Sequence, residues 1–231
     1  MEQHLLESPT DVEERCLELG FLPFFRCGIP GFSIEEMVAH EYWFTDEEGA
    51  WEWKGPIIRD GQCAYGKFFN RKAGFVSRAW LPDWANYRRS LHLAPNDDAA
   101  ALDDVVLQTI LAEGSATIKE LRRMLGFAKG RGRRTAADLE SEVAEDEKIS
   151  LDPILTRLQM EARLVIADFE YNIDRHGSPY GWGVARYMAP ESLYGPLRTE
   201  RTPEESFERI RDHFRELFPA VPESRLRRLI G

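Results

Sequence analysis

The sequence is poor in cysteine and contains no long apolar segment. Cys16, Cys27 and Cys63 are too few and too widely spaced for a disulfide framework, so we expect reduced thiols. No cysteine or histidine pair has the spacing of zinc ligands, and we predict neither a metal site nor a cofactor. No apolar run approaches the roughly 20 residues that span a bilayer, and the N-terminal region is acidic where a secretory signal would be basic and then apolar. We therefore expect a cytoplasmic protein with no membrane segment.

Positive charge is also scarce. The formal net charge of the 231 residues is -10, which argues against indiscriminate binding to phosphate backbones. The charges are unevenly distributed, however. Residues 54–89 contain eight basic side chains against two acidic ones, whereas residues 138–148 contain six acids and one lysine. A locally positive face can therefore exist on this acidic protein.

Residues 151–191 change their hydrophobic period from that of a helix to that of a strand. Asp152 and Pro153 favour the start of a helix, and apolar residues then recur at helical spacing: Ile154, Leu155, Leu158 and Ala162. From Val165 to Ile173 apolar and polar residues alternate, which predicts a strand. A turn follows, and the chain returns as GWGVARYM. A helix that leads into a long hairpin is typical of the second half of a winged-helix module.

Two further helices are predicted upstream of this segment. One carries an apolar stripe from Leu102 to Ile110 and ends at Gly114, and the next begins at the capping box formed by Thr117 and Glu120. We predict an α+β fold in which a winged-helix module, three helices plus a β-hairpin wing, is coupled to an aromatic-rich N-terminal α/β lobe. That lobe is alternatively a degenerate second winged helix. The predicted division is an N-terminal lobe at 1–95, a winged-helix domain at 96–195 with an insertion at 127–149, and C-terminal helices at 196–231.

The N-terminal lobe holds five of the six tryptophans, which suit either a core of large side chains or a surface that stacks bases. Residues 44–62 are rich in loop-forming residues, and within them the segment WEWK alternates aromatic and polar side chains. We take Trp51, Glu52, Trp53 and Lys54 as the best candidate cleft. A carboxylate between two tryptophans would have a raised pKa and suit general acid or base catalysis, which makes Glu52 the candidate catalytic residue. The alternative is an ion pair between Glu52 and a nearby cation, either Lys54 or one of Lys67 and Arg71.

The predicted nucleic-acid contacts lie on the third helix, on the wing and on two loops. If the third helix enters a groove, its outward side consists of Thr156, Arg157, Gln159 and Arg163. Arg175 and His176 at the wing tip would then reach phosphates or the neighbouring groove. The insertion supplies a basic loop with Arg131, Arg133 and Arg134, and Lys67 and Arg71 add charge from the N-terminal hairpin. Alternatively, the basic loop is solvated and pairs with its own acidic half.

Two long segments of the sequence resemble a known family. WEWKGPIIRDGQCAYGKFFNRKAGFVSRAWLPDWANYRR and ILTRLQMEARLVIADFEYNIDRHGSPYGWGVARYMAPE are similar to the bacterial AlkZ-related proteins, which are themselves similar to parts of the winged-helix DNA glycosylases AlkZ and YcaQ. The resemblance implies a DNA repair function. Those glycosylases use a motif of Gln, a hydrophobic residue, and Gln or Asp. None of the four glutamines here is followed two positions later by Gln or Asp, so the motif is absent: Gln3, Gln62, Gln108 and Gln159.

Three functions from different classes follow from these observations. We favour a winged-helix protein that binds double-stranded DNA and performs no reaction. The second is a DNA repair hydrolase that cleaves N-glycosidic bonds with a reassigned site around Glu52, with aromatic side chains stacking an extruded base. The third is a winged-helix module that binds protein, which would fit the acidic balance and a third helix with few exposed cations.

Overall fold

The computed structural model describes residues 5–43, 49–126, 150–173 and 179–231. Its strands form a single antiparallel sheet in the order β1-β3-β2-β5-β6-β4. The strands are β1 (Phe21–Pro23), β2 (Cys63–Phe69), β3 (Lys72–Ser77), β4 (Ala116–Thr117), β5 (Val165–Ile173) and β6 (Pro179–Met188). None of the helices in the described ranges has the length and apolar character needed to cross a membrane.

The N-terminal part of the chain packs helices against β1, β2 and β3. These helices are α1 (Pro9–Leu19), α2 (Ile34–Met37), the 3-10 helix η1 (His40–Tyr42), α3 (Ala50–Asp60) and α4 (Leu81–Arg89). The sequence predicts a short helix that follows Ser8, runs through Leu19 and ends at Gly20, and α1 confirms these limits. The Ser8 hydroxyl accepts a hydrogen bond from the Asp11 amide at 3.2 Å, and Gly20 ends the helix with a φ of 77°. A side chain would be strained at that φ, so glycine fits the position.

The prediction that residues 44–62 form a loop-rich connection is wrong, because α3 occupies most of the described part. Gly49 precedes the helix and Pro56 lies inside it. Glycine and proline usually interrupt helices, so both residues argue against a helix here. Burial compensates for this local cost, since Trp53, Ile57 and Ile58 face the core. Tertiary packing therefore overrides the glycine and proline signals.

The sequence predicts two short strands, CAYGKFF and GFVS, around a turn at residues 70–74. Both strands are confirmed as β2 and β3, but β3 begins earlier than predicted, at Lys72, so the turn is shorter. Asn70 and Arg71 form the turn with φ values of 52° and 67°, as a tight two-residue hairpin turn requires. The prolines and glycines of residues 20–32 predict irregular structure whose aromatic side chains fill a core, yet Phe21–Pro23 adds a short edge strand beside β3. The expectation that aromatic side chains of this segment fill the core is confirmed by Phe21, Phe24 and Phe32, all of which are buried.

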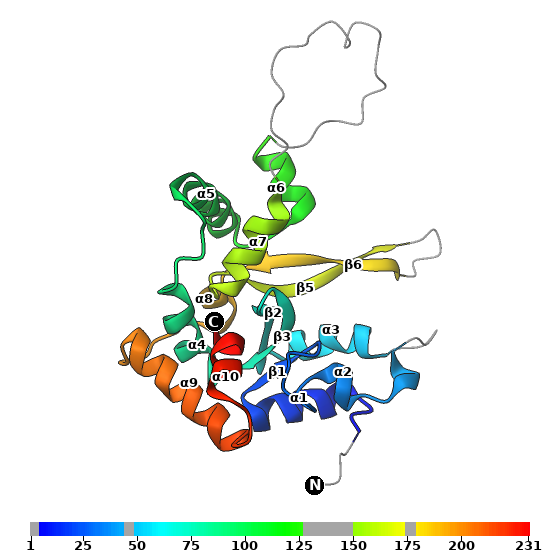
Figure 1. Ribbon diagram of the computed structural model, residues 1–231. Helices are drawn as coiled ribbons and strands as arrows, with labels where there is room; N and C mark the ends of the chain where they lie inside the picture. The colour runs from blue at the N-terminus through cyan, green and yellow to red at the C-terminus, as the bar shows by residue number, and fades with distance from the viewer. Residues whose placement is uncertain (1–4, 44–48, 127–149, 174–178) are drawn as a thin grey trace, which may run out of the picture.

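The middle of the chain contains three helices and the long hairpin in the predicted order. They are α5 (Asp97–Glu113), α6 (Ile118–Met124), α7 (Leu151–Met160), and then β5 and β6. The capping box of α6 is present, since the Glu120 carboxylate accepts from the Thr117 amide at 2.8 Å. Helix α7 begins two residues before the predicted position, with Ser150 rather than Asp152 as its N-cap. In Figure 1 the β5–β6 hairpin projects from the body of the molecule and α6 lies above it.

The C-terminal helices pack on the N-terminal part of the sheet. They are α8 (Pro190–Tyr194), α9 (Pro203–Leu217) and α10 (Glu223–Ile230). The sequence predicts that the last segment, ESRLRRLIG, is a short helix docked through three apolar side chains. This docking is confirmed, because all three are buried in α10: Leu226, Leu229 and Ile230. These side chains belong to the same core as α1 and α3, whereas α5, α6 and α7 enclose a second core.

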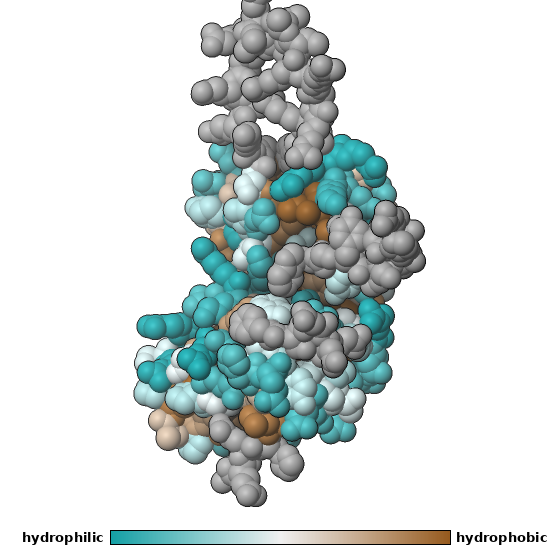
Figure 2. All heavy atoms as spheres, turned by 90° about the vertical axis from the view of Figure 1, so that its right-hand side faces the viewer, coloured by the Kyte–Doolittle hydropathy of each residue, from teal (hydrophilic) through white to brown (hydrophobic). Residues whose placement is uncertain are grey.

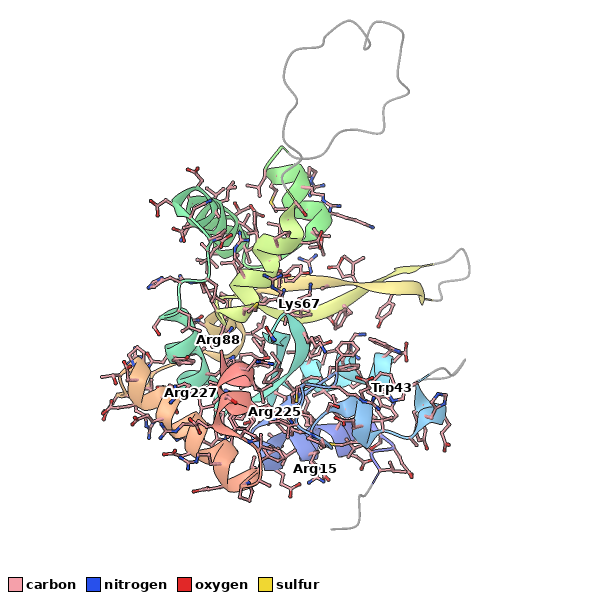
Figure 3. All side chains as sticks on the ribbon, in the orientation of Figure 1. Arg15, Trp43, Lys67, Arg88, Arg225 and Arg227 are labelled. Carbon is pink, nitrogen blue, oxygen red and sulfur yellow. The ribbon has the colours of Figure 1, made fainter. Side chains whose placement is uncertain are left out.

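A buried arginine links the parts of the fold. Arg88 of α4 donates from Nε to the Met160 carbonyl and from Nη1 to the Ile230 carbonyl, both at 2.6 Å. Burial lowers the pKa of this guanidinium to about 10. The arginine thus ties the C-terminal ends of α7 and α10 to α4 (Figure 3).

Candidate nucleic-acid interface

The polar side chains of α7 contact the neighbouring hairpin. Gln159 is 1% exposed, and its Oε1 accepts a hydrogen bond from the Lys67 amide at 3.1 Å while its Nε2 donates to the Leu155 carbonyl at 2.8 Å. The Thr156 hydroxyl lies 3.2 Å from Lys67 Nζ. The expectation that Gln159 points outward is therefore wrong, because β2 packs against this side of α7. Figure 3 shows Lys67 at this junction.

The two arginines of α7 and its C-terminal turn are held by carboxylates. Arg157 donates from Nε and Nη2 to the two carboxylate oxygens of Asp103 in α5, at 2.8 and 2.5 Å. Arg163 donates from Nε to Glu161 at 3.0 Å. A fork-shaped pair such as that of Arg157 and Asp103 is among the stronger side-chain interactions. Both guanidinium groups therefore already have anionic partners, and the third helix presents little free positive charge.

The other predicted cations do not gather at α7. Arg71 is exposed at the β2–β3 turn, and Lys54 lies on α3 beside β5. Lys67 serves as the link between β2 and α7. The remaining predicted contacts lie outside the described residues: Arg131, Arg133, Arg134, Arg175 and His176.

The predicted cleft residues separate into buried, half-buried and exposed positions. Trp53 is 4% exposed and packs near Tyr42 with ring centroids 5.4 Å apart, so it belongs to the core and cannot stack a base in this fold. Trp51 is half-buried and packs against Phe24, with the ring centroids 5.3 Å apart and the ring planes tilted. Successive residues of a helix point in different directions, so the two tryptophans do not enclose the residue between them.

Glu52 has a different role from the one that its neighbours suggested. It is exposed in the first turn of α3, and its Oε2 accepts a hydrogen bond from the Gly49 amide at 3.1 Å. An acidic side chain at this position satisfies a free N–H group and interacts favourably with the helix dipole. Glu52 therefore has a structural role as a cap of α3, and its catalytic role stays a hypothesis.

Lys54 lies between α3 and the long hairpin. Its Nζ is 4.8 Å from the ring centroid of Phe169 in β5 and 5.4 Å from that of Trp51. Burial lowers the pKa of the Lys54 ammonium, and the charge of Glu52 partly opposes that shift. A nearby ion pair, Arg59 Nη1 to Asp168 Oδ1 at 3.4 Å, also joins α3 to β5. The structure therefore brings two of the predicted cleft residues to the base of the hairpin.

Helix α6 presents a basic face that the sequence interpretation passed over. Lys119, Arg122 and Arg123 are exposed, and none forms an ion pair with another residue in the part of the chain that the structure describes. Their spacing of three and four residues places them on one side of the helix, with Leu121 buried on the other. That spacing was visible in the sequence, but only the apolar side of this helix was used there. We call these three residues the α6 basic face.

The α6 basic face has a fixed relation to the long hairpin. Thr117, which caps α6, pairs with Arg186 of β6, and the Arg186 guanidinium contacts Glu120 and Glu170. In Figure 2, which looks at the side from which the hairpin projects, hydrophilic residues surround a hydrophobic patch above it. The start of α6 is therefore held beside strand β6 of the hairpin.

A polar hollow of about 1090 Å³ lies on another part of the molecule, between α4 and the segment leading into α9. Asp83 is buried at its base, where it accepts a hydrogen bond from Ser206 Oγ at 2.8 Å and contacts the guanidinium groups of Arg201 and Arg209. The acidic and basic side chains that line the hollow nearly balance in charge: three acids, Asp83, Glu200 and Glu205, and four arginines, Arg89, Arg198, Arg201 and Arg209. We interpret Asp83 as a structural residue that holds α4 to α9. No cluster of potential metal ligands occurs within the described ranges.

Comparisons with known proteins agree on one relationship. A family model described as AlkZ related matches residues 6–231. No curated protein matches the sequence. Among solved structures, the fold is similar to that of the Streptomyces sahachiroi DNA glycosylase AlkZ, with a TM-score of 0.50 and 13% identity over 100% of this chain and 60% of that chain. The chain thus spans about three fifths of that structure, and at this identity the likeness is one of fold.

Proposed function

Because this chain belongs to the AlkZ-related family, we propose that it is a double-stranded-DNA-binding winged-helix protein of DNA repair that performs no glycosylase reaction. Helices α5, α6 and α7 followed by the β5–β6 hairpin have the order of a winged-helix module. The fold similarity to a DNA glycosylase supports the same partner. The observation that carries the proposal is the α6 basic face, which stays free of carboxylate partners within the described chain although the protein has a net charge of -10.

The proposed contact differs from that of a classical recognition helix. In α7, Gln159 is buried and Arg157 is paired with Asp103, so inserting this helix into a groove would first require breaking internal contacts. The exposed cations of α6 need no such rearrangement, and contacts of this kind position a protein on phosphates without reading sequence. We therefore expect weak, salt-sensitive binding with little preference for a particular base sequence.

Removing two charges from the α6 basic face should weaken binding to a duplex. For Arg122→Ala/Arg123→Ala we expect the slope of log affinity against log salt to become less negative by about 1.8, since each lost phosphate contact contributes about 0.9. Fluorescence anisotropy of a labelled 20-base-pair duplex, titrated at several salt concentrations, would measure both slope and affinity.

A matched double variant controls for the change in total charge. Arg198→Ala/Arg215→Ala also removes two exposed cations, from outside α6 and the hairpin, and should leave the slope within experimental error of the unmodified protein. The proposal would be wrong if the unmodified protein failed to bind even at low salt, or if both double variants lost affinity equally.

The protein should release no base from alkylated DNA. The Gln-containing motif of the resembling glycosylases is absent, and Glu52 is occupied as a helix cap. Incubation with duplexes carrying N7- or N3-alkylated purines, and with a crosslinked duplex, should therefore leave the bases attached. Turnover that disappeared in Glu52→Gln would instead establish the hydrolase alternative, and turnover that survived that change would place the active site elsewhere.

Binding to another protein is the second candidate function. Helix α7 has few free cations, as this alternative predicts, and α5 exposes Val105 and Leu111 at 50% and 44%. Exposed apolar side chains mark a protein interface where they form a contiguous patch. This candidate requires that duplex DNA of any sequence fail to bind, which the anisotropy titration decides directly.

A further inference from the structure

The side chain of Lys54 ends in an environment unusual for an amine. Its Nζ lies over the rings of Trp51 and Phe169 and makes neither a hydrogen bond nor an ion pair with any residue that the structure describes. The neighbouring cation on α3, Arg59, is paired with Asp168 instead. Lys54 is thus a half-buried amine with aromatic walls that forms no ion pair within the described chain, although the charge of Glu52 acts on it.

The adjoining face of the hairpin continues these aromatic walls outward. A Cβ atom added to Gly183 of β6 would lie 2.9 Å from Phe169 Cβ and 3.0 Å from Tyr171 Cζ. Both side chains therefore contact the same side of this glycine. They therefore share one face of the hairpin, the face on which Phe169 meets Lys54. Tyr171 is 37% exposed, and such a ring can stack a base or cover an exposed sugar.

This environment affects the reactivity of the amine in two opposite ways. Burial disfavours the ammonium form and lowers the pKa of Lys54, whereas the ring faces and the charge of Glu52 favour that form. A neutral amine is the nucleophile in imine formation, and lysines in apolar surroundings are commonly used for it. Because Lys54 forms no ion pair with the described residues, losing its proton breaks no salt bridge among them.

We propose that Lys54 attacks the C1′ aldehyde of an abasic site in DNA and forms an imine with it, an inference that rests on the proposed DNA-binding function. The nitrogen adds to C1′, and one water leaves as the C=N bond forms. Loss of a C2′ proton to solvent then breaks the C3′–O bond, and the 3′ phosphate departs. Water finally hydrolyses the imine, which releases the unsaturated aldehyde and restores the lysine amine.

This activity would have a defined place in a sequence of reactions. Its substrate is the product of N-glycosidic bond hydrolysis, so a separate base-removing activity must act first. The chain lacks the Gln-containing motif for that earlier step, as noted above. The Lys54 reaction would therefore follow base removal rather than perform it.

Borohydride trapping tests the inference. The full chain would be mixed with a duplex containing a single abasic site, treated with sodium borohydride, and separated under denaturing conditions. Reduction converts an imine to a stable secondary amine, so we expect a covalent protein–DNA product from the unmodified protein. Lys54→Arg keeps a cation over the rings but cannot form the imine, and it should lower the product at least about tenfold. Lys72→Arg, which changes an exposed lysine on β3, should leave the yield unchanged.

Binding to the abasic duplex would be measured by anisotropy for each variant in parallel. The inference is supported if Lys54→Arg still binds but gives no adduct, and if digestion and mass spectrometry place the adduct of the unmodified protein on Lys54. It is overturned if the protein binds without forming an adduct, or if the adduct maps to another lysine. Loss of all DNA binding would overturn the proposed function as well, so the two failures are distinguishable.

Discussion

Replacing Leu158 by alanine should lower the free energy of unfolding by about 2 to 5 kcal/mol, the usual cost of removing a core leucine. Leu158 is 1% exposed and packs with Leu155 and Leu164 in the core enclosed by α5, α6 and α7. The turn that leads from α7 into β5 folds back on this residue, since its carbonyl accepts hydrogen bonds from Arg163 and Leu164 at 2.8 and 3.1 Å. Close packing at this junction should limit how far the cavity collapses, and urea denaturation would measure the loss.

Val105→Ala provides the matched control for this experiment. Val105 lies on α5, in the same part of the chain, but is half exposed, so its truncation should change stability by less than about 0.5 kcal/mol. An unchanged denaturation midpoint for Leu158→Ala would show that the side of α7 assigned to the core is not the one that stabilises it.

Asp83→Asn should cost about 3 kcal/mol, the lower end of the range for breaking a buried ion pair. The carboxylate of Asp83 is 2% exposed and holds Arg209 and Arg201 as well as the Ser206 hydroxyl. Asparagine preserves the shape but removes the charge, and its amide group would face a guanidinium. The lower end applies because both arginines keep partial contact with water. Thermal unfolding followed by circular dichroism would report the change.

The control for that change is Asp212→Asn, also at a carboxylate paired with arginine. Asp212 is exposed and pairs with the adjacent Arg211, and surface pairs of this kind contribute at most about 1 kcal/mol. If both substitutions had the same small effect, Asp83 would not be the residue that fastens α4 to α9.

Local chemistry made much of the fold predictable. Ser8 with Pro9, and Thr117 with Glu120, mark helix starts because their side chains satisfy backbone groups within a few residues. Helix α3 could not be found in this way, since Gly49 and Pro56 give the opposite signal and the compensating burial involves distant parts of the chain. The sequence therefore predicted elements wherever local and tertiary preferences agreed.

The candidate site was less predictable because its determinants are long-range. Helical periodicity gives the two sides of α7 but cannot reveal that Lys67, 92 residues before Gln159, covers its polar side. Nor can it show that Arg157 is paired with Asp103, 54 residues upstream. Lys54 was selected from its aromatic neighbours in sequence, whereas its partner Phe169 became evident only in the fold.

The proposed interface requires that α6, and not α7, contact DNA. Hydrogen exchange of the full chain, measured with and without saturating duplex, can distinguish α6 from α7. We predict that DNA slows amide exchange in residues 118–124, while residues 151–160, already covered by β2 and α5, keep the same exchange rates. Protection confined to residues 151–160, with α6 unchanged, would contradict the proposed interface.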